Sequence, residues 1–109
     1  METIAIVLTI GNEHVDIFER GFREHELLVW QDLRSRGLLA RATLSRLDIS
    51  TSNVAGATQY LVAAIFTSGE GHHAHDDHPG FARWNEIADR YQVAPAMAFG
   101  GPTIVEVGD

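Results

Sequence analysis

The apolar positions of residues 3–10 alternate in size, which predicts a β-strand. Side chains two residues apart in a strand point to the same face of a sheet. One face carries the larger residues and the other the smaller ones: Ile4, Ile6, Leu8 and Ile10 against Ala5, Val7 and Thr9. Neither face of this strand is strongly polar.

From about residue 13 to residue 36 the apolar positions recur every three or four residues, which predicts one long amphipathic helix. The apolar stripe consists of Val15, Phe18, Phe22, His25, Val29 and Leu33. Gly37 follows two arginines in the last turn, and a glycine after a cationic turn is typical of a helix end. The stripe predicts that the ring of His25 faces the sheet.

The remaining elements are predicted from the same kinds of pattern. They are a strand at 39–48, a polar loop, a strand at 59–68, a helix at 81–92 with Pro79 near its first turn, and a strand at 103–108. The order β-α-β-β-α-β contains no internal linker or repeat. We therefore expect one α+β domain over residues 1–109. Its predicted fold is ferredoxin-like, a four-stranded antiparallel sheet with two helices on one side.

The strand at 59–68 is apolar on both faces. Tyr60, Val62, Ala64 and Phe66 alternate with Leu61, Ala63 and Ile65. Two helices cover only one face of a sheet, and a solvated face normally carries polar residues. Large bare apolar surfaces usually mark an interface, so we expect a second copy of the chain to pack sheet on sheet, forming a homodimer.

Composition then removes several classes of function. The formal net charge of −7 argues against binding to a nucleic acid. The chain has no cysteine, and all eight of its basic residues are arginine, so it offers no thiolate nucleophile and no lysine Schiff base. The longest apolar runs are too short to span a membrane. The N-terminus does not read as a signal peptide, and we expect a cytoplasmic protein.

A short motif after the third strand carries a resemblance. Ala74-His75 is followed by three residues, then Pro79, one residue, Phe81, two residues and Trp84. Together with the order of elements, this resembles the dimeric α+β barrel superfamily, which includes the antibiotic biosynthesis monooxygenase family and stress-responsive barrel proteins. The motif departs from the family at Gly80, where a histidine is common. The resemblance implies a scaffold that hosts oxygenases, isomerases and haem-degrading enzymes.

The run GHHAHDDHPG at 71–80 has three possible roles. His72, His75 and His78 could converge on a transition metal, although the run lacks a familiar zinc spacing. His75, at the family-like position, could instead be a catalytic group. The third possibility is a polar connection with solvated histidines, in which the aspartates favour the start of the next helix.

Other candidate site residues come from the helices. His25 could be a core histidine, or a base in a cavity between the first helix and the sheet. Aromatic residues could line a substrate pocket or belong to the core: Phe22, Trp30, Phe81, Trp84 and Tyr91. The acidic residues of the first helix, which include Glu19 and Glu26, are expected on its solvated face.

The resemblance and the histidine in the apolar stripe together predict a small homodimeric enzyme. It would act on a hydrophobic, aromatic or polyketide-like molecule as a cofactor-independent monooxygenase or an isomerase, with His25 or His75 as base. One alternative is a non-catalytic binding or structural dimer with Phe18, Phe22, Trp84 and Tyr91 filling the cavity. Another is a metal-binding protein. A transition metal or a haem would be the cofactor if the cofactor-independent reading is wrong.

Overall fold

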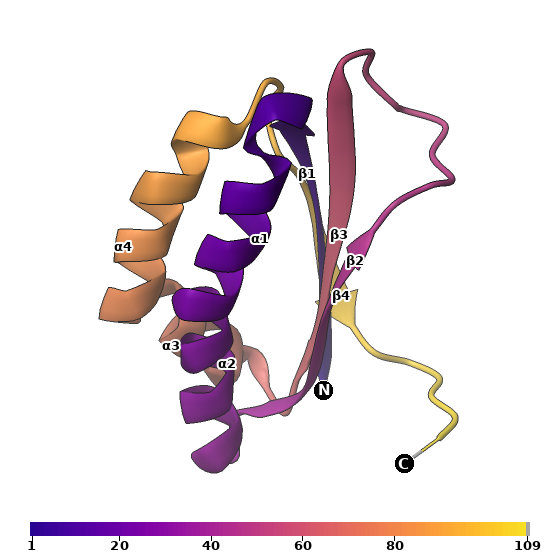
Figure 1. The fold of residues 1–109 in the computed structure, drawn as a ribbon. Coiled ribbons are helices and arrows are strands. Elements are labelled where there is room, and N and C mark those ends of the chain that lie inside the picture. Colours follow the sequence, from indigo (N-terminus) through magenta and orange to yellow (C-terminus); the bar gives the residue numbers. More distant parts are fainter. Residues whose placement is uncertain (109) are drawn as a thin grey trace.

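The computed structural model describes residues 1–108 as four strands, four α-helices and two short 3-10 helices (Figure 1). The first half of the chain contains β1 (Glu2–Gly11), η1 (Asn12–His14), α1 (Val15–Glu24), α2 (Glu26–Ser35) and β2 (Leu39–Arg46). The second half contains β3 (Ala57–Phe66), α3 (Gly69–Asp76), α4 (Pro79–Ala88), η2 (Asp89–Tyr91) and β4 (Met97–Pro102).

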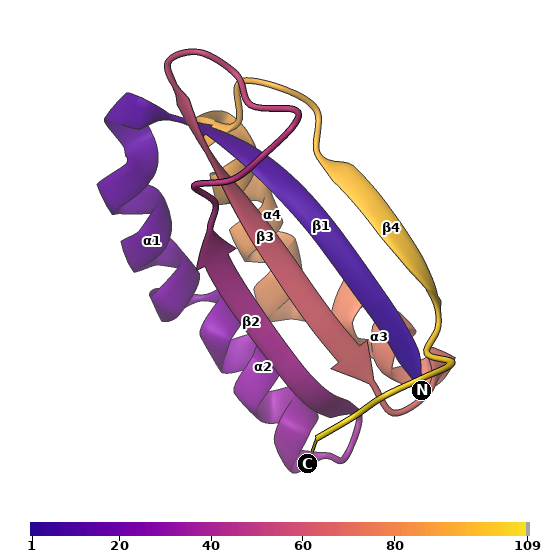
Figure 2. The ribbon, with the colours of Figure 1, turned by 90° about the vertical axis from the view of Figure 1, so that its right-hand side faces the viewer.

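The strands form one antiparallel sheet in the order β2-β3-β1-β4. All four α-helices lie on one face of this sheet, and the loop between β2 and β3 lies on the other (Figures 1 and 2). In the β1–β3 register Ile6 lies opposite Val62, and both line a cavity beneath the helices. The predicted ferredoxin-like α+β fold is confirmed.

The predicted helix at 13–36 is in fact two helices. His25 separates α1 from α2 with φ −121° and ψ −68°, outside the helical region. Because of this break, the side chain that points inward is that of Glu26 and not that of His25. Glu26 is 5% exposed, whereas His25 is half-buried. The prediction that His25 faces the sheet is therefore wrong. The predicted end of the helix is correct, because Gly37 follows α2 with a φ of 74° that favours glycine.

The second half of the chain also differs in detail from the predicted boundaries. The histidine-rich run forms a helix of its own, α3, and α4 begins at Pro79. The last strand is β4 at 97–102, not 103–108, and residues 103–108 form no regular structure. Gly100 explains why residues 97–102 pair with β1 although their sequence is not typical of a strand. A Cβ atom there would lie 2.6 Å from Cδ1 of Ile4.

The core lies between the helices and the sheet and is rich in aromatic rings. Phe18 is fully buried, with its centroid 4.7 Å from that of Tyr60 and 5.7 Å from that of Trp84. Phe22 lies 6.0 Å from Trp84 at an interplanar angle of 85°. These contacts pack α1 against both β3 and α4 and hold the layer of helices against the sheet.

The opposite face of the sheet is partly apolar. The β2–β3 loop covers one end of it, where Gln59 donates to Thr9 Oγ1 and to the carbonyl of Ser52. Elsewhere on this face Phe99 is 61% exposed. Within residues 1–108 no helix is long and apolar enough to cross a membrane.

Candidate active site

A cavity of about 190 Å³ lies between the helices and the sheet, on the side of the edge strand β4. Aromatic rings of α1 and α4 form its roof, and Ile6, Leu8 and Val62 form part of its floor. Ala96 and Ala98 line the side toward β4 and are exposed. Because these two side chains are small, the space beneath the aromatic roof stays open.

One buried ion pair lines this largely apolar space. Nε2 of His75, on α3, lies 2.9 Å from Oε1 of Glu26, on α2. The two side chains are 13% and 6% exposed. The other ring nitrogen of His75 lies 3.1 Å from Oδ1 of Asp76, whose side chain is half exposed. The ring also packs against Phe81, with centroids 4.3 Å apart.

The two carboxylates favour the charged form of His75. Burial of the ring opposes protonation, but the hydrogen bond and charge of Glu26, with a smaller contribution from Asp76, outweigh it and raise the pKa of His75 above its ordinary value. An imidazole with a carboxylate at each nitrogen can donate from both when it is protonated. His75 thus lies between two carboxylates that both favour its protonation.

Glu26 was expected on the solvated face of the helix, and this prediction is wrong. The sequence did contain a signal for its burial. Glu26 lies four residues after Phe22 and three before Val29, a spacing that puts all three on one helix face. His25 fits the same stripe equally well, so only the position of the helix break distinguishes the two residues.

The predicted site residues divide into two groups. Phe22, Phe81 and Trp84 line the cavity together with His75 and Glu26. The other three lie elsewhere: His25 stacks on Trp84 with centroids 5.7 Å apart, Trp30 lines a second cavity, and Tyr91 packs beside His14.

Asn85, Ala88 and Gln92 are lining residues that sequence reasoning missed. Ala88 lies four residues after Trp84, and this helical spacing could have identified it as an inward position. Asn85 and Gln92 are polar, and no pattern in the sequence set them apart from surface residues.

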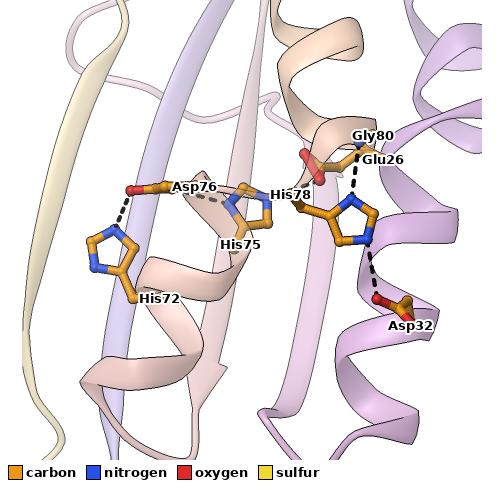
Figure 3. A network of polar contacts seen from close by, with 7 residues as sticks. All are labelled: Glu26, Asp32, His72, His75, Asp76, His78 and Gly80. Carbon is orange, nitrogen blue, oxygen red and sulfur yellow. Dashed lines mark hydrogen bonds and ion pairs between the residues drawn. The ribbon is translucent and has the colours of Figure 1, made fainter.

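The histidines proposed as metal ligands do not converge (Figure 3). Asp76 lies between the rings of His72 and His75, while His78 turns to Asp32 on α2. Among residues 1–108 no group of three or more His, Cys, Asp or Glu side chains is arranged to hold a metal ion. His75 also fits poorly as a haem ligand, since both of its nitrogens already contact carboxylates and a haem is larger than this cavity.

The position at which the motif departs from the family has a steric explanation. A Cβ atom at Gly80 would lie 2.8 Å from Cγ2 of Val29 and 3.1 Å from Nδ1 of His78. A side chain at this position would therefore push α4 away from α2. Gly80 therefore offers no side chain at the position where a histidine is common in the family that the motif resembles.

Comparison with solved structures supports the same fold. An antibiotic biosynthesis monooxygenase-like protein from Nitrosomonas europaea superposes with a TM-score of 0.77 at 8% identity, covering 96% of this chain and 100% of that one. HapK from Hahella chejuensis gives 0.73 at 18% identity, with 100% and 98% coverage. SnoaB from Streptomyces nogalater, a cofactor-independent oxygenase, gives 0.70 at 14% identity, with 99% and 97% coverage.

The chain shares their fold. The resemblance to the dimeric α+β barrel superfamily is thus confirmed at the level of the fold. No protein-family model matches the sequence, and no curated protein matches it either.

Proposed function

We propose that the chain binds a small aromatic molecule in the cavity beside His75 and transfers a proton to or from it. The observation that supports this is a buried ion pair that opens onto a largely apolar cavity. Perturbed ionisable groups in a cavity are common features of catalytic sites. The volume of about 190 Å³ is below the roughly 300 Å³ of drug-sized sites, which suits a molecule of one or two rings.

His75 can take part in proton transfer in two ways. As an imidazolium, His75 stabilises a phenolate or enolate formed from the bound molecule. As a neutral imidazole, it accepts a proton at the nitrogen that the exposed Asp76 vacates. The first role requires activity to fall as the pH rises through the pKa of His75, and the second requires it to rise.

The reaction that we propose is oxygenation without a bound cofactor, by analogy with SnoaB, or isomerisation. Both begin with an anion of the substrate, and the site supports formation of that anion. His25 lies outside the cavity, so we assign the proton transfer to His75 with Glu26 rather than to His25.

Two variants test this function. Replacing Ala98 with leucine fills the cavity without touching the ion pair, and replacing His75 with glutamine removes the charge. We expect His75→Gln to reduce turnover of hydroxylated naphthalenes by about 100-fold or more, because a positioned proton-transfer group contributes at least that factor. Ala98→Leu should also reduce turnover, because it removes the space that the substrate occupies. Oxygen uptake measures oxygenation, and deuterium exchange from solvent measures isomerisation.

The matched control for Ala98→Leu is Ala82→Leu, an equal change at an exposed position of α4. Unchanged turnover in both Ala98→Leu and His75→Gln would place the chemistry elsewhere. Saturable binding with no turnover in the wild-type protein would instead favour the non-catalytic binding alternative.

We also propose that two copies pack through the open face of the sheet. Phe99 on β4 is exposed there, and Ile104 in the C-terminal segment is 89% exposed. Burial of such surface drives association. Light scattering is expected to give twice the mass of one chain, and Phe99→Asp to give one chain. A monomeric wild-type protein would contradict this assembly. A cytoplasmic location remains a prediction.

A further inference from the structure

A second cavity lies under α1 and α2, on the side of β2. It measures about 280 Å³ and is separated from the first cavity by Phe22, which lines both. Its apolar walls come from Leu27 and Trp30 on the helices and Leu44 on β2. The proposed proton transfer uses none of these other residues.

Three hydrogen-bonded side chains form the polar wall of this cavity. Glu19 accepts a hydrogen bond of 2.5 Å from the hydroxyl of Tyr60 and one of 2.9 Å from Nε of Arg46. The bond from Tyr60, helped by Arg46, lowers the pKa of Glu19. Burial and the hydrogen bond to Glu19 raise the pKa of Tyr60 to about 12. Tyr60 therefore stays a neutral donor, and Glu19 stays a carboxylate that holds Arg46 in place.

This cavity is lined by more guanidinium groups than carboxylates. Arg46 binds Glu19 through Nε and Nη2 and also interacts with the hydroxyl of Tyr60. Arg23, one turn after Glu19 on α1, also lines the cavity and is exposed, and its charge acts on Glu19. Two arginines against one glutamate leave the wall with one excess positive charge in a chain of net charge −7.

We propose that this second cavity binds a small organic carboxylate, with its apolar body against Trp30 and Leu44 and its carboxylate at Arg23 and Arg46. Guanidinium groups bind carboxylates through paired hydrogen bonds, and a guanidinium already fixed by a neighbour loses less entropy on binding. The apolar wall selects for an aromatic or branched body over a short polar acid. This site is independent of the function proposed for His75.

The two tryptophans of the chain report on the two cavities separately, because Trp30 lines the second cavity and Trp84 the first. Their indole N–H signals can be followed by NMR during titration with 2-naphthoate and, as a neutral match, 2-naphthamide. Trp30→Phe and Trp84→Phe assign the signals. We expect 2-naphthoate to shift the Trp30 signal saturably and to bind at least 10-fold more tightly than the amide, because hydrogen bonds to charged groups are the stronger ones.

Arg23→Gln tests the charge. It should weaken the binding of 2-naphthoate about 10-fold and leave the binding of the amide unchanged. The control is Arg83→Gln, which removes an exposed arginine of α4 outside this cavity and should change the affinity for neither ligand. Equal affinity for acid and amide, equal effects of the two arginine variants, or no saturable shift at Trp30 would each overturn the proposal. A shift confined to Trp84 would also overturn it while leaving the function proposed for the first cavity intact.

Discussion

His75 and His78 lie three residues apart, and each pairs with a carboxylate of α2, yet their surroundings differ. His75 and Glu26 have side chains that are 13% and 6% exposed, and their pair lines the first cavity. His78 and Asp32 are 22% and 43% exposed, and their pair lies at 3.1 Å toward the surface. Because charges in an apolar cavity interact more strongly than charges in water, similar pairs have unequal consequences.

Both ring nitrogens of His78 are held by groups that fix the start of α4. Its Nδ1 accepts a hydrogen bond of 2.9 Å from the backbone N–H of Gly80 at the start of α4, so Nε2 is the nitrogen that donates to Asp32. His78 is therefore a helix cap tied to a neighbouring helix. His75 caps no helix and lines the first cavity, and one of its two partners, Asp76, is half exposed, which is why we assign the chemistry to His75.

The largest expected difference between the pairs is in stability when the carboxylate is neutralised. Glu26→Gln leaves the buried ring of His75 without its main partner and should lower the free energy of unfolding by about 2 kcal/mol. Breaking a buried pair typically costs more, but His75 can lose its proton. Asp32→Asn is the matched control and should change stability little, because that carboxylate is solvated. Urea denaturation measures both, and equal effects would contradict the distinction.

Removal of the cap should have a smaller effect. His78→Ala deletes the acceptor for the N–H of Gly80 and is expected to cost about 1 kcal/mol, as for other helix caps. His73→Ala, an exposed position on α3, is the control and should cost less. If the two variants unfold at the same denaturant concentration, the capping bond does not contribute.

The smallest expected effect is a dependence of stability on pH. The pKa of His75 is raised in the folded protein, so its contribution is fully present below the unfolded value and is lost as the pH rises through the folded value. The stability difference between the wild-type protein and His75→Gln should therefore be larger at about pH 5.5 than at about pH 9. Thermal unfolding across that range checks the sign, and a difference that grows with pH would contradict it.

The pattern of the sequence was sufficient to predict the fold, because most of its strands and helices are encoded locally. Alternation in residues 3–10, Gly37 at a helix end and Pro79 at a helix start all act within a few residues. The last strand was misplaced for a physical reason. Residues 103–108 have the higher β-propensity, but β4 is selected by the space that Gly100 leaves beside Ile4 on another strand.

The site was predicted less completely, because the partner of His75 depends on which face of the helix turns inward. His75, Phe81 and Trp84 were named from the motif, and all three line the cavity. Glu26 was missed because a break at one residue, His25, decides which of two neighbours is buried. Similarly, Glu19 was placed on a solvated face, although it binds Tyr60 and Arg46 on two strands.

A titration of the histidine rings by NMR tests the central claim most directly, namely that Glu26 holds His75 in its charged form inside the cavity. The ring signals of the six histidines would be followed against pH in the wild-type protein and in Glu26→Gln. We predict that His75 titrates above the ordinary value of 6.5 in the wild-type protein and at a lower pH in the variant. A His75 that titrates at or below the ordinary value, unaffected by Glu26→Gln, would contradict the account.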